Sequence, residues 1–369
     1  MRMQKKVYLD NAATTPLCES FLANIQEYAA LYYNASSANE SSLMIKQEIE
    51  KCRQKIAKLI NCEPEEIYFT SGASEANSWA IDGFLKAQNN EYYRVIATNI
   101  EHSSIMNNQN VSEFIKCDQY GQVRPEQFEC YDNCLFCIGL ANNEIGTIQP
   151  IAKISEVIHK TNGNYLFVDA TQALTKVNID VKKMGIDMMS ASGHKIGALK
   201  GIGFLYINKN MSISPIIYGS QENSLRGGTY NYLGIKSLSV ALSKVKQPYK
   251  VAALRGHLAN MLIRLPANIM INGHRVNRLP DNLNICIKNM SIDAQQLVAL
   301  LDMNGFVVSA GSACHAGDSK PSHVLKAIGL SDTDASCSIR ITLGEQNTRE
   351  EIDAFIECLK NIIDMHKSA

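Results

Sequence analysis

Short apolar runs alternate with amphipathic stretches along the first two thirds of the chain. The runs with the residue content of buried strands are Ile67–Thr70, Arg94–Thr98, Leu135–Leu140, Tyr165–Asp169, Met188–Ser190 and Gly203–Ile207. Helical spacing lies between them, for example over Glu75–Gln88 and Ile151–Thr161, and Pro150 precedes the second stretch at a position typical of a first turn. Strands that alternate with helices predict an α/β fold with a mainly parallel sheet, whose ligands gather at the carboxyl ends of the strands.

The pattern changes after about residue 250. The segments predicted there are a helix at Ala252–Leu265, a strand at Asn282–Ile287, a helix at Asp293–Met303, extended chain at Val307–Ala310 and Ser338–Leu343, and a helix at Arg349–Met365. We therefore expect two domains. Residues 15–250 form the larger one, and residues 1–14 and 251–369 form a smaller α+β domain.

Charge and cysteine content narrow the range of partners. The 369 residues include 36 basic and 36 acidic side chains, so nothing in the net charge favours nucleic acid or an anionic membrane. Apolar runs such as Cys134–Ala141 are too short to span a bilayer, and no apolar stretch of secretory length follows the basic start. Eleven scattered cysteines are typical of reduced thiols. These features predict a cytoplasmic protein without a membrane or nucleic-acid partner.

Two polar residues stand at the ends of predicted strands. Lys195 follows the strand that ends near Ser190, in the loop Ser192–Lys195, and a buried lysine there can lose its charge and attack a carbonyl carbon. Asp169 ends another apolar strand, where a fixed anion can keep a pyridine nitrogen protonated. Each also has an ordinary interpretation, as a surface lysine and as a helix cap or turn aspartate.

A third segment, Thr70–Glu75, joins a predicted strand to a helix. Its small residues let backbone N–H groups approach an anion, and a helix N-terminus favours a phosphate, although ordinary capping would use the same residues. The segment has neither a GxGxxG fingerprint nor a Walker lysine, which disfavours dinucleotide and P-loop sites. Amine, anion and phosphate cradle at successive strand ends are together the parts that a pyridoxal-phosphate site requires.

Several longer motifs then occur in one order along nearly the whole chain. They are Tyr8–Pro16, Thr70–Glu75, Glu101-His102, Asn142–Gly146, Val168–Gln172, Ser192–Lys195, Arg226–Thr229, Gly311–Cys314 and Ser338–Arg340. In these motifs the chain resembles the NifS/IscS-like cysteine desulfurases of the class V aminotransferase family. The Gly-Ser-Ala-Cys segment is the most specific, because other class V enzymes lack its cysteine.

The resemblance implies a fold-type I enzyme that uses pyridoxal 5'-phosphate and has a mainly parallel seven-stranded sheet in its large domain. Such an enzyme is a sulfurtransferase that converts L-cysteine to L-alanine and collects the sulfur as a persulfide on Cys314. It also implies a homodimer and a protein that accepts the sulfur, either an iron–sulfur scaffold or a tRNA-thiolation enzyme. Two alternatives are a selenocysteine lyase or related class V lyase, which Cys314 disfavours, and a non-catalytic thiol scaffold, which Lys195, Asp169 and Arg340 disfavour.

The same resemblance assigns a role to individual residues. The cofactor would be held by Lys195 as a Schiff base, by Asp169 at the ring nitrogen, by His102 on the ring face, by Asn143 and Gln172 at the phenolic oxygen, and by Ala73, Ser74, Ser192 and His194 at the phosphate. Thr229 would reach the phosphate of the neighbouring subunit. Arg340 would clamp the substrate carboxylate, a task suited to a planar bidentate donor, with help from Asn34 and Asn143. His102 would also move protons, and Cys314 would react as a thiolate.

Some positions depart from the family pattern or invite another interpretation. Asn34–Asn39 lacks the usual proline and histidine, Ala198–Gly201 lacks a proline, and His315 follows the reactive cysteine as an expected surface histidine. Cys130, Cys134 and Cys137 could suggest a metal site, but no second ligand pair is nearby, so we expect core thiols and no metal. Cys337 is likewise expected to pack, and His323 to begin a helix.

Overall fold

A seven-stranded mixed sheet forms the centre of the larger part of the protein. The computed structural model describes residues 6–88, 92–244, 248–311 and 321–367. The strand order is β2 (Ile67–Thr70), β8 (Gly203–Ile207), β7 (Met188–Ser192), β6 (Tyr165–Asp169), β5 (Cys134–Gly139), β3 (Arg94–Thr98) and β4 (Val111–Ile115). β8 is antiparallel to both of its neighbours and every other pairing is parallel. The predicted α/β fold with a mainly parallel seven-stranded sheet is confirmed.

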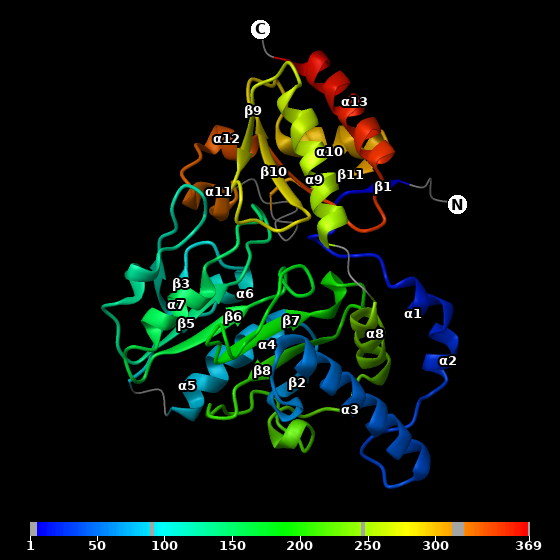
Figure 1. Ribbon diagram of the computed structural model, residues 1–369, viewed down its shortest axis with the longest axis vertical. Helices are drawn as coiled ribbons and strands as arrows, with labels where there is room; N and C mark the ends of the chain where they lie inside the picture. Colours follow the sequence, from blue (N-terminus) through cyan, green and yellow to red (C-terminus); the bar gives the residue numbers. More distant parts are fainter. Residues whose placement is uncertain (1–5, 89–91, 245–247, 312–320, 368–369) are drawn as a thin grey trace.

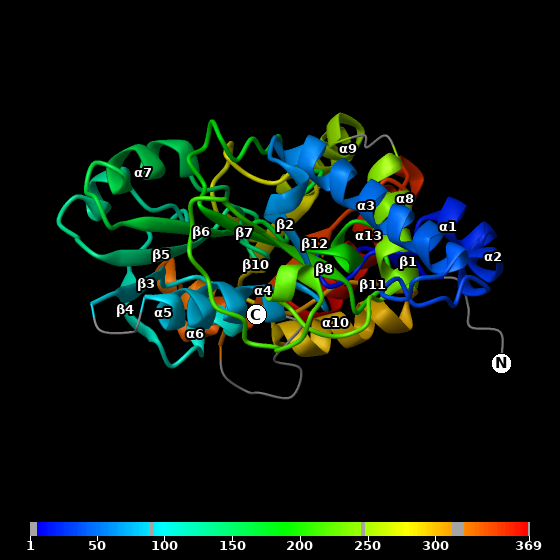
Figure 2. The same cartoon turned by 90° about the horizontal axis from the view of Figure 1, so that it is seen from below.

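Helices cover both faces of this sheet, which explains why its central strands read as continuous apolar runs. Successive residues of β5 enter two different cores, with Phe136 and Ile138 in one and Leu135 and Cys137 in the other. The first core is closed by α3 (Glu40–Ile60), α7 (Ile151–Ile158) and α8 (Tyr232–Ser243), and the second by α4 (Ala73–Ser78), α5 (Phe84–Ala87) and α6 (Ser103–Met106). Figure 2 shows these two sets on opposite sides of the strands.

A second group of elements packs above the carboxyl ends of the parallel strands (Figure 1). Its antiparallel sheet has the order β12 (Ser338–Thr342), β10 (Asn282–Ile287) and β9 (Ile269–Asn272), and its helices include α9 (Pro248–Ile263), α10 (Ala294–Met303), α11 (His323–Ala327), α12 (Asp332–Ser336) and α13 (Arg349–His366). The N-terminal strand β1 (Val7–Tyr8) pairs with β11 (Phe306–Val307). Leu9 therefore joins a core formed otherwise by residues from Val251 onward.

Element bounds differ from the sequence prediction in a few places. The helix predicted at Glu75–Gln88 begins at Ala73 and passes through a π-helical turn, Trp79–Gly83, before it continues as α5. α1 (Glu19–Ala23), α2 (Ile25–Ala29), α3, α8, β4 and β9 were not predicted. β4 is an edge strand with three exposed residues at its centre, so its sequence lacks the apolar run of a buried strand. Within the described residues, no helix has the length and apolar content needed to cross a membrane.

Candidate active site

A cavity of about 510 Å³ opens where the parallel strands end, below the smaller sheet. Ten of the residues singled out in the sequence line it: Ala73, Ser74, His102, Asn143, Asp169, Gln172, Ser192, His194, Lys195 and Arg340. Two others are elsewhere: Thr229 is exposed and lines a separate hollow, and Asn34 is exposed with its side chain accepting from the Ser36 amide. Cys314 and His315 lie outside the described residues.

Lys195 reaches the cavity from a tight turn directly after β7. Residues Gly193–Lys195 form a 3₁₀ turn, and a Cβ at Gly193 would lie 2.9 Å from the Ile202 side chain and 3.1 Å from its carbonyl oxygen. Only glycine fits there without displacing a neighbour. The Lys195 Nζ donates to the carbonyl oxygens of Ala12, at 2.5 Å, and Ala13, at 2.8 Å. The N-terminal segment thus provides two acceptors for the lysine amine.

The Asp169 carboxylate lies at the end of β6 and lines the same cavity. Its Oδ1 accepts from the Thr171 amide at 2.9 Å, and its Oδ2 accepts from the Asn77 side chain at 2.9 Å. The first bond is the turn interaction that the ordinary interpretation of this residue predicts. Since each oxygen has a second lone pair, the carboxylate can still accept a proton-bearing group of a ligand.

The part of the cavity lined by Ala73, Ser74 and His194 suits an anion. Ala73 and Ser74 begin the helical run that continues to Ala87, and a helix N-terminus favours negative charge. Lys195 and Lys200 both line the cavity. Burial, with these two cations beside it, lowers the pKa of His194 to about 4, which favours the neutral imidazole.

Two buried polar atoms in the cavity wall fit a further ligand group. Thr171 Oγ1 and Gln172 Oε1 have no hydrogen-bond partner in the described part of the chain. The Gln172 amide nitrogen donates to the Ala12 carbonyl at 3.0 Å, which fixes the side chain in place. A primary amine, a carboxylate, an anion cradle and these atoms together fit pyridoxal 5'-phosphate, with its aldehyde, ring nitrogen, phosphate and phenolic oxygen.

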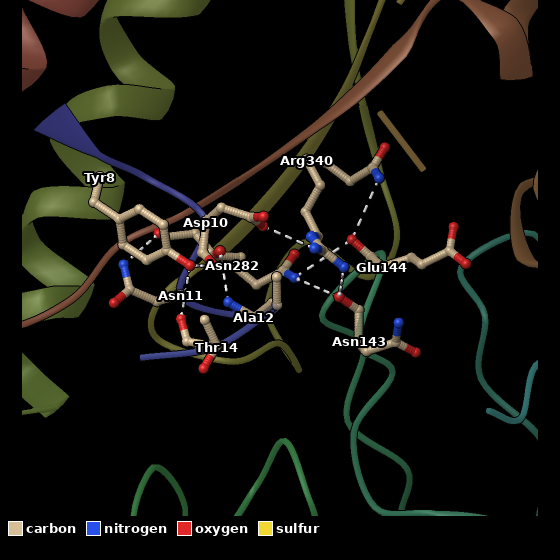
Figure 3. A network of polar contacts seen from close by, with 12 residues as sticks. Tyr8, Asp10, Asn11, Ala12, Thr14, Asn143, Glu144, Asn282 and Arg340 are labelled. Atoms are coloured by element: carbon tan, nitrogen blue, oxygen red, sulfur yellow. Dashed lines mark hydrogen bonds and ion pairs between the residues drawn. The ribbon is translucent and has the colours of Figure 1, made fainter. Parts of the chain in front are cut away.

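Arg340 enters the cavity from the smaller sheet and is 1 % exposed. Its Nη2 contacts Asp10 Oδ1 at 2.8 Å and its Nη1 donates to the Asn143 carbonyl at 3.1 Å (Figure 3). The Nε atom has no partner among the described residues. A guanidinium with two occupied donors and a buried, unpartnered Nε can bind a carboxylate.

Asn77 was not predicted from the sequence, and Asp10, Glu101 and Lys200 drew attention only as members of longer motifs, with no role of their own. Glu101 lines the cavity, and burial, reinforced by Asp169, raises its pKa to about 7. Asn77 is fully buried on α4 beside the apolar residues Ala76 and Trp79. A polar residue within an apolar stretch was the available signal for Asn77, because a buried amide needs partners.

The cysteines Cys130, Cys134 and Cys137 differ in their burial. Within the described residues no group of three or more His, Cys, Asp or Glu side chains is placed to hold a metal ion. Cys134 and Cys137 are buried in the two cores of the large sheet, as predicted, and burial raises the pKa of Cys137 well above that of a free thiol. Cys130 is exposed, so the prediction of a core thiol is wrong at that position. His323 begins α11 as predicted, and its Nε2 donates to the Glu101 carbonyl at 3.0 Å.

The fold and the cavity agree with a comparison against known families. The sequence model described as Aminotransferase class-V matches residues 7–355, and the chain belongs to this family. It is therefore a pyridoxal-phosphate-dependent enzyme.

Comparisons with single proteins give narrower names than the family model does. The chain is 36 % identical over 376 residues to "Cysteine desulfurase IscS" of Methanosarcina thermophila, covering 97 % of this chain and 92 % of that protein. A solved structure named "NIFS-LIKE PROTEIN" superposes with a TM-score of 0.89 at 31 % identity, over 98 % of this chain and 100 % of that one. Another, "SspA in complex with cysteine", has a TM-score of 0.79 at 32 % identity, over 91 % of this chain and 98 % of that one.

Proposed function

We propose that the chain is a cysteine desulfurase that converts L-cysteine to L-alanine and transfers the sulfur to its own Cys314. The observation that carries the proposal is one cavity lined by Lys195, Asp169 and Arg340, in a chain 36 % identical to a named cysteine desulfurase over 97 % of its length. An amine, a ring-nitrogen anion and a carboxylate clamp are the groups that an amino acid and this cofactor require together.

We assign the cofactor-holding residues as follows. Lys195 would form the covalent link, Asp169 would contact the ring nitrogen, His102 would pack on the ring face, and Asn143 and Gln172 would contact the phenolic oxygen, while Ala73, Ser74, Ser192 and His194 would bind the phosphate; all of them line the cavity. When bound, pyridoxal phosphate supplies an electron sink that makes the Cα proton of an attached amino acid acidic. His194, whose pKa is lowered by burial and by the nearby Lys195 and Lys200, would act at the phosphate through a ring N–H group.

The remaining steps belong to side chains of the chain itself. Arg340 binds the substrate carboxylate through its unpartnered Nε and a neighbouring Nη group, while Asp10 and the Asn143 carbonyl hold the guanidinium plane. Lys195, as a free amine, would move the Cα proton of the substrate. The carbonyl oxygens of Ala12 and Ala13 stabilise its ammonium form within reach of the cavity.

Cys314 supplies the nucleophile, as a thiolate. Its sulfur forms a bond with the substrate sulfur as the Cβ–sulfur bond of the substrate breaks, and protons return to the carbon skeleton to give L-alanine. The enzyme thiol and cysteine thus become an enzyme persulfide and alanine, with no external oxidant. The outer sulfur atom of the persulfide is then transferred to a protein acceptor, which we propose to be an iron–sulfur scaffold or a tRNA-thiolation enzyme.

We further propose a cytoplasmic homodimer with the division into residues 15–250 and residues 1–14 plus 251–369. Thr229 is exposed and outside the cavity of its own chain, which supports a role at the phosphate of a partner chain. Asn34 is also exposed, and in a dimer it would contact the carboxylate of the substrate that is bound in the cavity of the partner chain. The scattered cysteines of the sequence support a reducing compartment.

The test is to incubate the holoenzyme with L-cysteine and measure alanine, sulfide release in the presence of a thiol reductant, and the mass of the peptide that contains Cys314. Wild-type enzyme should form alanine and a peptide heavier by one sulfur atom. Cys314→Ser should keep the bound cofactor and lose the persulfide, because the serine hydroxyl cannot accept sulfur. Persulfide formation that persists in Cys314→Ser, or its absence from wild type, would refute the proposed function.

A further inference from the structure

Asn77 connects two cofactor-facing residues through one buried side chain. Its Nδ2 lies 2.9 Å from Asp169 Oδ2 and 2.8 Å from Ser104 Oγ, and its Oδ1 lies 2.6 Å from Ser190 Oγ. Ser104 Oγ in turn lies 2.9 Å from His102 Nδ1. The bonds join α4, α6, β6 and β7 beneath the cavity, and Asn77 itself is fully buried.

The direction of each bond follows from the chemistry of the partners. A carboxylate only accepts, so the Asn77 atom that faces Asp169 must be the nitrogen, and its two hydrogens go to Asp169 and Ser104. Asn77 Oδ1 must then accept from the Ser190 hydroxyl. Since Ser104 Oγ accepts from Asn77, its own hydrogen is available for His102 Nδ1, which also accepts from the Ser104 amide at 3.2 Å. The neutral His102 ring therefore carries its proton on Nε2.

We propose that Asn77 is a positioning residue that orients the Asp169 carboxylate directly and the His102 ring through Ser104, so that the two side chains are held as one unit. Asp169 takes one hydrogen bond on each oxygen, from Thr171 and from Asn77, so its remaining lone pairs have a fixed direction. His102 is held as the N-cap of α6 by its own Nδ1. If Asp169 contacts the nitrogen of a flat ligand ring and His102 packs on the face of the same ring, the two contacts together define the plane of the ring. Residues held in this way select one orientation of the ring.

The inference rests on the proposed function only for the identity of that ligand, and its test uses no cysteine. Apoenzyme is dialysed against pyridoxal 5'-phosphate to obtain a dissociation constant, and apoenzyme labelled with ¹⁵N-histidine gives the Nδ1 resonance of His102, assigned with His102→Gln among the eight histidines. Asn77→Ala should raise the dissociation constant about tenfold or more, because a hydrogen bond to a charged group is lost. It should also shift the His102 Nδ1 resonance, two hydrogen bonds away.

Ser104→Ala should shift the same resonance and raise the dissociation constant by about threefold, the effect expected for one neutral hydrogen bond, while Ser104→Thr retains the hydroxyl and the wild-type values. The matched control is Asn164→Ala. Asn164 is also buried, with bonds to the Cys134 amide and the Tyr131 carbonyl, and it is not among the residues lining the cavity. Its loss should lower stability and leave both readouts unchanged.

A folded Asn77→Ala apoenzyme with wild-type cofactor affinity and an unmoved His102 resonance would overturn the proposal. If Asn77→Ala does not fold, Ser104→Ala decides, and an unchanged dissociation constant in that variant overturns it. A wild-type protein that binds the cofactor but releases no sulfur from cysteine would instead contradict the proposed function and leave the role of Asn77 standing.

Discussion

At the scale of single residues, the contact between Asp10 and Arg340 bears directly on the carboxylate binding proposed for the cavity. Both side chains are buried and 2.8 Å apart, and the removal of one member of a buried pair leaves an uncompensated charge. Asp10→Asn keeps an acceptor for Nη2 and removes only the negative charge. The remaining positive charge gains more from a carboxylate ligand than it does in the wild type.

We therefore expect Asp10→Asn to lose about 1–3 kcal/mol of unfolding free energy, and to recover more of it than wild type on binding L-alanine. Urea denaturation with and without alanine measures both quantities. Asp302→Asn is the control, because Asp302 pairs with Lys6 at an exposed position where an ion pair contributes little. Equal stability of Asp10→Asn and wild type would show that the buried pair is not what holds Arg340.

At the scale of elements, His159 fastens the end of α7 to the loop before β7. Its Nε2 lies 2.9 Å from Asp187 Oδ2 and its Nδ1 lies 3.0 Å from Ser155 Oγ, whose hydrogen goes to the Gly185 carbonyl. Both ring nitrogens thus face acceptors, and the hydrogen bond to Asp187 raises the pKa of His159 above 6.5. The arrangement contains the residue types of a hydrolase triad, but the serine is buried and its hydrogen is already donated to a carbonyl.

The pKa of His159 is higher in the folded than in the unfolded protein, so protonation of His159 stabilises the fold. This stabilisation is fully present below the unfolded pKa of about 6.5, and it is lost as the pH rises through the folded pKa. The difference in unfolding free energy between wild type and His159→Gln should accordingly be larger at acidic than at alkaline pH. Urea denaturation of both proteins across this range measures it, and Asp187→Asn should remove the same pH dependence. A difference that grows toward alkaline pH would contradict this account of the α7 end.

The elements also show what the sequence could predict. β3, β6 and β8 occupy the predicted residues, because strands buried on both faces read as short apolar runs with clear ends. β4 was not predicted, because its exposed position at the edge of the sheet permits the polar residues Ser112 and Glu113, which interrupt the apolar run of a buried strand. The helix after β2 was placed two residues late, since its first turn consists of small residues whose role is set by the loop rather than by packing.

At the scale of the whole molecule, the N-terminal segment joins the two sheets across the cavity. Asn11 donates to the Thr342 carbonyl, 331 positions away in sequence, at 2.8 Å, while Ala12 accepts from Lys195 and Gln172. The proximity of Asp169 and Lys195 can be predicted from the sequence, because the topology of a parallel sheet places the carboxyl ends of its strands at one edge. The contact of Asp10 with Arg340 cannot be predicted in this way, because no local sequence pattern indicates a pairing between residues so far apart in the chain.

The arrangement of the whole molecule gives Lys195 the central position, between the large sheet and the N-terminal segment. Lys200 lines the same cavity and is the natural competitor for the covalent link. The most direct test is to reduce the holoenzyme with borohydride, digest it and identify the modified lysine by mass spectrometry. Our account predicts a pyridoxyl group on Lys195, and none in Lys195→Ala; a group on Lys200, or on no lysine, would contradict it.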